Sequence, residues 1–246
     1  MWISNRIPRA ATVRRLLVLC CLCAAPLAGL GCSGAEKDTA ATPANEPSTP
    51  ATEPATVAPV DAAAQEVATG FLEAYGAFDT DQAITYLAGD ADVSVLVGSV
   101  GSFGATGTLE QFPLLISQLE AEGYRQMLHP CEELGTSASG TNIRCTFDFH
   151  LLGSDEIGLG PYSGSSFELT VRDGKIVQAA VTVEIAEFSP QMWEPFRFWV
   201  RSAFPEDFEV MYTGYGDGAR LTEESTRLWE QHRHDYVEEV LVLTSP

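Results

Sequence analysis

Two runs of β-branched and aromatic residues meet at a two-residue turn in the second half of the chain. The runs are 165–172 and 175–186, and Asp173-Gly174 separates them. An Asp-Gly pair between such runs is a strong signal for a tight β-hairpin. A two-residue turn also predicts which residues face each other across the two strands. The predicted pairs are Arg172 with Lys175, Val171 with Ile176, Leu169 with Gln178, and Phe167 with Ala180.

Three helical patterns precede the hairpin. The first begins at Asp61 and has apolar residues at intervals of three and four positions, and Asp79 is a cap signal for a shorter second helix. A third helix is expected over about 110–122. The residues expected to be buried are Val67, Phe71, Ala74 and Phe78 in the first helix and Leu114, Leu115, Ile116 and Leu119 in the third. Each helix is apolar on one side, so the helices need a sheet to cover that side.

Further strands are expected at 91–97, 124–133 and 141–152. Residues 98–107, between the first of these strands and the third helix, are rich in glycine. The segment lacks the lysine and the spacing of a phosphate-binding loop, so it is expected to be a connection only.

Aromatic residues are concentrated in the helix that Ser189-Pro190 starts, and a last helix is expected over about 222–241. The aromatic residues of the first of these helices are Trp193, Phe196, Phe198, Trp199 and Phe204. Two interpretations remain open. Trp193 and Trp199 stack on a flat ligand and are the candidate ligand-binding residues, or the cluster is a lid buried on the sheet.

The first 31 residues have the pattern of an export signal. Four arginines and no acidic residue precede an apolar run, Leu16 to Leu30, which is short for a membrane span. The run ends in small residues before Cys32 and resembles a bacterial lipoprotein signal, although Gly29 stands where a large aliphatic residue is usual. We expect residues 1–31 to be the signal peptide and acylated Cys32 to anchor the chain in the lipid bilayer. The alternatives are an ordinary secretory signal and an uncleaved anchor.

Composition divides the rest of the chain into a tether and a domain. Residues 32–60 are mainly Ala, Thr, Pro, Glu and Ser, so they offer almost nothing to bury and are expected to form a disordered tether. Residues 61–246 have the length of one domain. Without the four arginines of the signal, ten basic residues face 34 acidic ones, a net charge of −24. Such a charge repels phosphates, so a nucleic-acid partner is not expected.

Two cysteines, Cys131 and Cys145, lie in the expected domain. The residues between them are rich in turn formers, and a hairpin centred on Ala138 places the two cysteines opposite each other. Facing strand residues can be bridged by a disulfide, which suits an oxidising compartment. A metal site needs more ligands at close spacing, so no metal ion is expected. These features predict a location at the extracytoplasmic face of the bacterial cell envelope.

Three stretches resemble the nuclear transport factor 2-like superfamily, in its branch of SnoaL-like polyketide cyclases and ketosteroid isomerases. They are Val67 to Asp79 running into Tyr86 to Val93, then Gly107 to Phe112, and Phe167 to Val177. The resemblance implies an α+β fold, in which a cone-shaped, curved antiparallel sheet packs on N-terminal helices around a pocket. The late helices are then a C-terminal extension.

Enzymes of this branch commonly carry reactive side chains just after the hairpin turn. Ala179, Ala180 and Val181 stand at those positions, and none of them can transfer a proton. The resemblance therefore favours a non-catalytic module that binds a small apolar ligand or another envelope protein, with no cofactor.

Two other functions remain open. Asp148 and His150 are two residues apart, so on a strand they share one face and can form an acid–base pair of an isomerase or lyase. The other interpretation of this pair is a solvent-facing one behind a core of Phe147 and Phe149. The third function is a structural one, in which the outer face of the sheet forms a homodimer.

Overall fold

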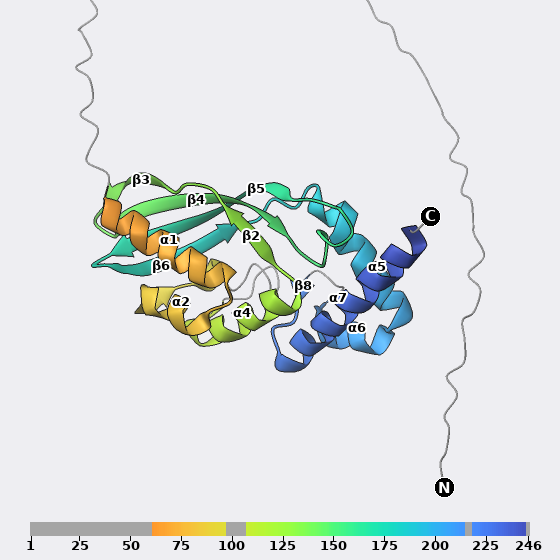
Figure 1. Cartoon of the computed structure of the whole chain (residues 1–246). Helices are drawn as coiled ribbons and strands as arrows, with labels where there is room; N and C mark the ends of the chain where they lie inside the picture. The colour runs from red at the N-terminus through yellow and green to blue at the C-terminus, as the bar shows by residue number, and fades with distance from the viewer. Residues whose placement is uncertain (1–60, 97–106, 215–217, 245–246) are drawn as a thin grey trace, which may run out of the picture. The chain divides into compact units, whose positions relative to one another are not determined.

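The structure, a computed structural model, describes residues 61–96, 107–214 and 218–244 (Figure 1). The predicted signal peptide, the predicted tether and Cys32 lie outside these residues, as does nearly all of the glycine-rich segment 98–107. In the described part of the chain, no helix combines the length and the apolar character needed to cross a bilayer.

Two capped helices begin the described part. Helix α1 (Ala62–Gly76) is capped by Asp61, whose carboxylate accepts a hydrogen bond from the backbone three residues on, at 3.2 Å. Helix α2 (Thr80–Tyr86) is capped in the same way by Asp79, at 3.0 Å. A side-chain acceptor at this position satisfies a backbone N–H that the helix leaves without a partner. Both predicted helices are confirmed.

The third predicted helix is also present. A short 3₁₀ turn, η1 (Leu109–Gln111), leads into α4 (Phe112–Ala121), and Glu122 is the C-cap. The buried residues of α4 are Phe112, Leu115, Ile116, Gln118, Leu119 and Ala121. One of them, Gln118, is polar.

The strands form a curved, mainly antiparallel sheet. They are β1 (Leu87–Asp92), β2 (Arg125–Leu128), β3 (Glu132–Ser137), β4 (Gly140–His150), β5 (Tyr162–Arg172) and β6 (Lys175–Thr182). Their order is β1-β6-β5-β4-β2, with β3 also paired to β4, and the β1–β6 pair is parallel. Helix α1 lies across one face of the sheet, where Tyr75 packs edge-on against Phe167 with ring centroids 5.5 Å apart (Figure 1). The predicted α+β fold, with its curved antiparallel sheet against N-terminal helices, is confirmed.

Two predicted strands have different bounds. The strand expected at 91–97 overlaps β1 only at residues 91–92. After β1 the Asp92 carboxylate accepts a hydrogen bond from Ser94 N–H at 3.0 Å, and residues 94–96 form a helical turn instead of a strand. The strand expected at 124–133 is divided into β2 and β3. Pro130 lies between them, and proline has no N–H to donate to a sheet.

The predicted hairpin joins β5 to β6, but half of its predicted register is wrong. Arg172 pairs with Lys175 and Val171 with Ile176, as expected. Beyond them Val177 is an extra residue, a β-bulge, and the pairing moves by one position. Leu169 therefore faces Ala179 instead of Gln178, and Phe167 faces Val181 instead of Ala180.

A disulfide joins Cys131 to Cys145, with the two Cα atoms 4.2 Å apart. The disulfide lies at the open end of the β3–β4 hairpin. Next to it Glu132 faces Arg144, and these two residues are equidistant from Ala138, so the register there is the predicted one. A shift beside Leu134 then moves the turn itself half a residue towards the C-terminus.

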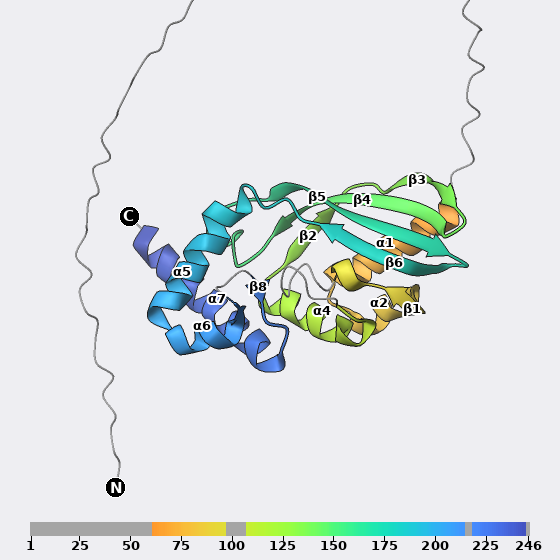
Figure 2. The ribbon, with the colours of Figure 1, turned by 180° about the vertical axis from the view of Figure 1, so that it is seen from behind.

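The C-terminal helices gather at one end of the sheet (Figures 1 and 2). They are the π-helical turn η2 (Ser189–Trp193), α5 (Glu194–Ala203), α6 (Pro205–Met211) and α7 (Glu223–Thr244). Two short strands, β7 (Tyr212–Thr213) and β8 (Gly218–Ala219), pair between α6 and α7. Trp229 of α7 stacks on Trp193 and on Phe196, with ring centroids 5.7 and 5.4 Å apart. The late helices therefore have an aromatic core of their own.

Candidate functional site

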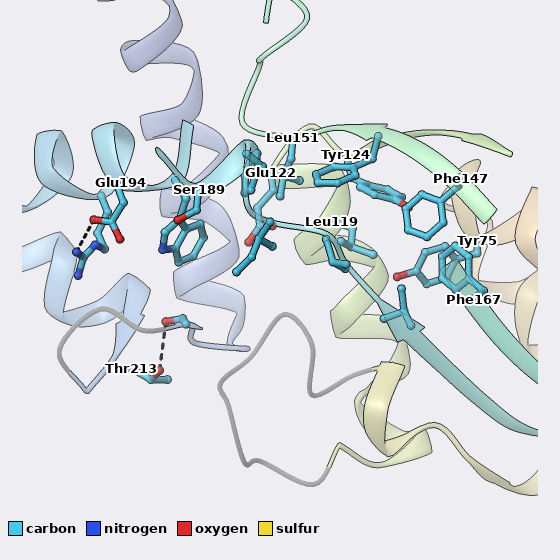
Figure 3. Close-up of a pocket in the computed structure, with 18 of the residues that line it drawn as sticks. Tyr75, Leu119, Glu122, Tyr124, Phe147, Leu151, Phe167, Ser189, Glu194 and Thr213 are labelled. Atoms are coloured by element: carbon cyan, nitrogen blue, oxygen red, sulfur yellow. Dashed lines mark hydrogen bonds and ion pairs between the residues drawn. The ribbon is translucent and has the colours of Figure 1, made fainter. Parts of the chain in front are cut away.

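A cavity of about 570 Å³ lies between the inner face of the sheet, the helices α1 and α4, and the C-terminal helices (Figure 3). Its aromatic wall comes mainly from the long central strands. Phe147 and Phe149 of β4 line it, and so does Phe167 of β5, whose ring stacks on Phe147 with centroids 4.6 Å apart. Side chains alternate along a strand, so these phenylalanines share one face.

The aliphatic wall consists of Val181, near the end of β6, and of Val183 and Ile185, which follow the strand. The place of Val181 depends on the bulge at Val177. Without the extra residue, the alternation from Ile176 to the end of β6 would turn Gln178, Ala180 and Thr182 inward. The bulge therefore places Val181 in the cavity lining instead of Thr182.

Glu122 is the one carboxyl group of the described cavity lining that is almost completely buried, with 2% of its surface exposed. It stands at the C-terminal end of α4, and Gln118 Nε2, one turn earlier, donates a hydrogen bond to its Oε1 at 2.7 Å. Burial raises the pKa of Glu122 to about 7, and the bond from Gln118 opposes that rise. A carboxyl with this pKa changes its charge near neutral pH.

The Gln118 amide is itself held by the last helix. Thr226 Oγ1 of α7 lies 2.8 Å from Gln118 Oε1 and donates to it, because an amide oxygen only accepts. The same hydroxyl lies 3.0 Å from the carbonyl oxygen of Thr222. A chain of hydrogen bonds thus runs from α7 through Gln118 to Glu122.

Two buried tyrosines line the cavity together with this carboxyl group. Tyr75 comes from α1 and Tyr124 follows α4, and their rings meet edge-on with centroids 6.2 Å apart. Burial raises the pKa of both phenols well above the ordinary value, and the charge of Glu122 adds to the rise at Tyr75. Tyr124 Oη donates to Gln126 Oε1 at 3.0 Å. Both phenols are therefore neutral hydrogen-bonding groups at physiological pH.

The other end of the cavity carries an ion pair. Arg197 Nη2 lies 2.6 Å from Glu194 Oε2, one turn apart on α5, and both residues line the cavity (Figure 3). The Arg197 guanidinium also lies over the Phe198 ring, 5.0 Å from its centroid. Glu194 therefore offsets the charge of Arg197.

The acid–base pair of Asp148 and His150 is not assembled at the cavity. Both side chains lie on the other face of β4 from Phe147 and Phe149, and neither lines the cavity. Asp148 Oδ2 is 3.3 Å from His129 Nε2, whereas His150 Nδ1 is 3.1 Å from Ser154 Oγ. Strand alternation turns both side chains away from the inner face, and on the outer face each has a partner of its own.

The two candidate tryptophans are in different places. Trp193 lines the cavity and stacks on Trp229. Trp199 does not line it, and its indole N–H donates to Glu239 at 2.8 Å. Two residues six positions apart fall on different sides of a helix, which separates them. Among the residues described, no group of three or more His, Cys, Asp or Glu side chains is placed to hold a metal ion.

Several solved structures are similar to about half of the chain. A proposed polyketide cyclase from Pseudomonas putida is 18% identical, with a TM-score of 0.36, over 52% of this chain and 96% of its own. A second, from Silicibacter sp., is 20% identical, with a TM-score of 0.36, over 52% and 93%. A nuclear transport factor 2-like protein of unknown function from Cytophaga hutchinsonii is 11% identical, with a TM-score of 0.33, over 50% and 91%.

These alignments span about half of this chain and more than nine tenths of each of the three solved structures. No protein-family model matches the chain, and no curated protein is significantly similar to it.

The sequence interpretation missed Glu122, Gln118 and the two tyrosines. A signal for the first two exists in the helix pattern. Leu115 and Leu119 lie on the buried face, and Gln118 and Glu122 each follow one of them by three positions. Polar residues in register with a buried stripe mark a helix whose apolar side also holds a polar group.

Proposed function

We propose that the domain binds a small, largely apolar ligand in the cavity and holds a polar group of that ligand at Glu122. The observation that carries this proposal is an aromatic and aliphatic cavity of about 570 Å³ with an almost completely buried carboxyl in its lining. Ligand sites are typically hydrophobic cavities of about 300–1,000 Å³ with a few placed polar groups. Burial of the ligand at roughly 25 cal/mol per Å² of apolar surface supplies the affinity, and the polar group supplies orientation.

The test uses a neutral environment-sensitive dye such as Nile red, displaced by candidate ligands. Val181→Trp fills the cavity from its aliphatic wall and is expected to weaken dye binding at least tenfold. The matched control is Thr182→Trp, which adds the same indole to the next residue of β6, on the exposed side. Equal weakening by both variants, or no binding of the dye to the wild type, would contradict a ligand in this cavity.

Proton transfer to or from the bound ligand is a second candidate function. It rests on the pKa of Glu122, which burial raises to about 7, a value suited to a general acid or base at neutral pH. The test screens the purified domain against enones, epoxides and lactones. Turnover that Glu122→Gln abolishes and Asp148→Asn leaves intact supports catalysis at the cavity. Turnover that is lost in Asp148→Asn would instead support Asp148 and His150, on the outer face, as the acid–base pair.

We further propose that acylated Cys32 holds the domain at the extracytoplasmic face of the cell envelope. The support is the signal-like sequence that precedes Cys32 and the Ala-, Thr- and Pro-rich residues 32–60 that follow. Cys32→Ala is expected to move the protein from the detergent phase to the aqueous phase. Absence of an acyl mass on wild-type Cys32 would contradict the anchor.

A partner in the envelope, another protein or a second copy of this chain, is part of the same proposal. Native mass spectrometry of the protein taken from its own membrane measures both. A monomer with no associated protein leaves the small ligand as the binding function.

A further inference from the structure

The cavity lining contains more acidic than basic side chains. Among the described residues that line it, the charged side chains are Glu122, Glu194 and Arg197. Arg197 and Glu194 lie 2.6 Å apart and offset each other. The tyrosines of the lining stay neutral because burial raises their pKa values. The cavity therefore holds one uncompensated negative charge whenever Glu122 is ionised.

Glu122 has capacity for more donors than Gln118 supplies. An ionised carboxylate offers about four acceptor sites on its two oxygens, and Gln118 Nε2 occupies one of them at Oε1. A buried carboxylate with unfilled sites is costly unless a donor or a positive charge reaches it. A ligand in the cavity is in a position to supply both.

The aromatic wall favours the same sign of charge. The faces of phenyl and phenol rings carry partial negative charge and attract cations, an effect strengthened by removal from water. Tyr124 lies beside Glu122 in the cavity, and Tyr75, Phe147 and Phe167 lie further along (Figure 3). The net charge of the whole chain, −20, adds a long-range attraction for cations.

Building on the proposed function, we infer that the cavity takes a lipophilic organic amine. Its ammonium group pairs with Glu122, and its apolar body lies along Phe147, Phe167 and Val181. The charge of Glu122 is expected to discriminate between three kinds of ligand head group. An ammonium donates to the carboxylate and gains from its charge, a hydroxyl group donates without that gain, and a carboxylate is repelled.

The experiment compares three ligands that share one body: 4-phenylbutylamine, 4-phenylbutan-1-ol and 4-phenylbutanoate. Isothermal titration at pH 8, where Glu122 is ionised, is expected to find the amine at least tenfold tighter than the alcohol and the carboxylate weakest. The measurement is repeated in 0.5 M salt. A preference that came only from the net charge of the surface would be lost there, whereas pairing at a buried group is screened much less.

The pH dependence is a separate readout that needs no variant. Lowering the pH from 8 to 5 protonates Glu122, whose pKa is about 7, while the amine stays charged. The amine is therefore expected to lose at least tenfold in affinity, and the alcohol to change less than threefold. The other titratable or charged groups of the described cavity lining are Tyr75, Tyr124, Glu194 and Arg197. Tyr212 is influenced by the charge of Glu122, and Arg233 donates to the carbonyl of the neighbouring Ala121. Burial raises the pKa values of the three tyrosines, so they stay neutral at both pH values.

Glu122→Gln removes the charge and keeps the shape, so it is expected to abolish the preference for the amine at both pH values. Asp148→Asn is the control, since it removes a carboxylate on the outer face. Equal affinity of amine and alcohol in the wild type, or an amine preference that survives in Glu122→Gln, overturns the inference and leaves the proposed function intact. Failure of all three ligands and of Nile red to bind overturns the proposed function itself.

Discussion

Two carboxylates of this domain, Glu122 and Asp148, lie on opposite sides of the central strands and differ in burial and in their partners. Glu122 is buried beside the cavity, its partner is the neutral amide of Gln118, and burial raises its pKa to about 7. Asp148 is partly exposed and lies 3.3 Å from a half-exposed imidazole, that of His129. Residue type alone favoured Asp148, because it has a histidine two positions away on the same strand face. Removal from water, which depends on the tertiary structure, favours Glu122.

The same contrast runs along β4 and β5, where each strand has an inner and an outer face. On β5, Phe167 is fully buried at the cavity, and its neighbour Glu168 makes an exposed ion pair with Arg144 at 2.7 Å. The inner face therefore holds the hydrophobic core and the cavity, and the outer face holds charged side chains exposed to solvent.

Phe167→Ala is expected to lower the free energy of unfolding by about 3–5 kcal/mol, since a buried phenylalanine leaves an enlarged cavity. Glu168→Ala, one residue along, is expected to cost less than about 1 kcal/mol because exposed ion pairs contribute little. Chemical denaturation of both variants measures the difference. Similar losses for the two would mean that the faces do not differ as described.

Glu122 is expected to make the wild type less stable as the pH rises from about 4.5 to about 7. The folded state keeps the proton on Glu122 up to about pH 7, and the unfolded state loses it near 4.5, so unfolding releases a proton in this range. The loss is about 3 kcal/mol relative to Glu122→Gln, which has no proton to lose. Denaturation at several pH values checks it. Parallel pH profiles for the two proteins would show an ordinary pKa at Glu122.

Gln118→Leu is expected to raise the pKa of Glu122 further, because the ionised carboxylate loses its donor. A hydrogen bond to a charged group contributes about 1.5 kcal/mol, so the pH at which stability is lost moves up by about one pH unit. Gln178→Leu, an exposed position on β6, is the control and is expected to leave that pH unchanged. A downward movement in Gln118→Leu would show that the amide does not favour the ionised form.

Asp148→Asn and His150→Gln are expected to change the free energy of unfolding by less than about 0.5 kcal/mol each and to leave binding of Nile red unaltered. Both residues are partly exposed and stand away from the cavity. A change in ligand affinity of more than threefold in either variant would connect the outer face to the site.

Local signals account for the parts of the fold that the sequence predicted well. Asp61 and Asp79 each cap a helix through atoms three residues away, and Asp173-Gly174 closes a turn with positive φ at both residues. These interactions are complete within a few residues, so they are visible in the sequence. The bulge at Val177 has no such mark, because nothing in its neighbourhood distinguishes it from a regular strand residue.

The candidate site was predicted less well for a related reason. Of the two tryptophans that the sequence offered as candidates, Trp193 lines the cavity and Trp199 does not. Tyr75 and Glu122 are 47 positions apart, and no local pattern brings them together. The pKa of Glu122 exists only once α1, α4 and the sheet have removed it from water. An ionisable group in register with a buried helix stripe is the one sign of this that the sequence carries.

The hydrogen bond between Thr226 and Gln118 connects the last helix, α7, to the buried carboxyl group of the cavity. Gln118 contacts both Glu122 and Thr226. The ionisation of the Glu122 carboxyl and the docking of α7 against α4 are therefore energetically coupled. Such linkage is reciprocal: protonation of Glu122 changes how firmly α7 is held by the same amount that displacement of α7 changes the proton affinity of Glu122. Helix α7 runs from Glu223 to Thr244 and is about 33 Å long at 1.5 Å per residue. Protonation of Glu122 therefore affects the first turn of α7, a long helix that ends near the C-terminus of the chain.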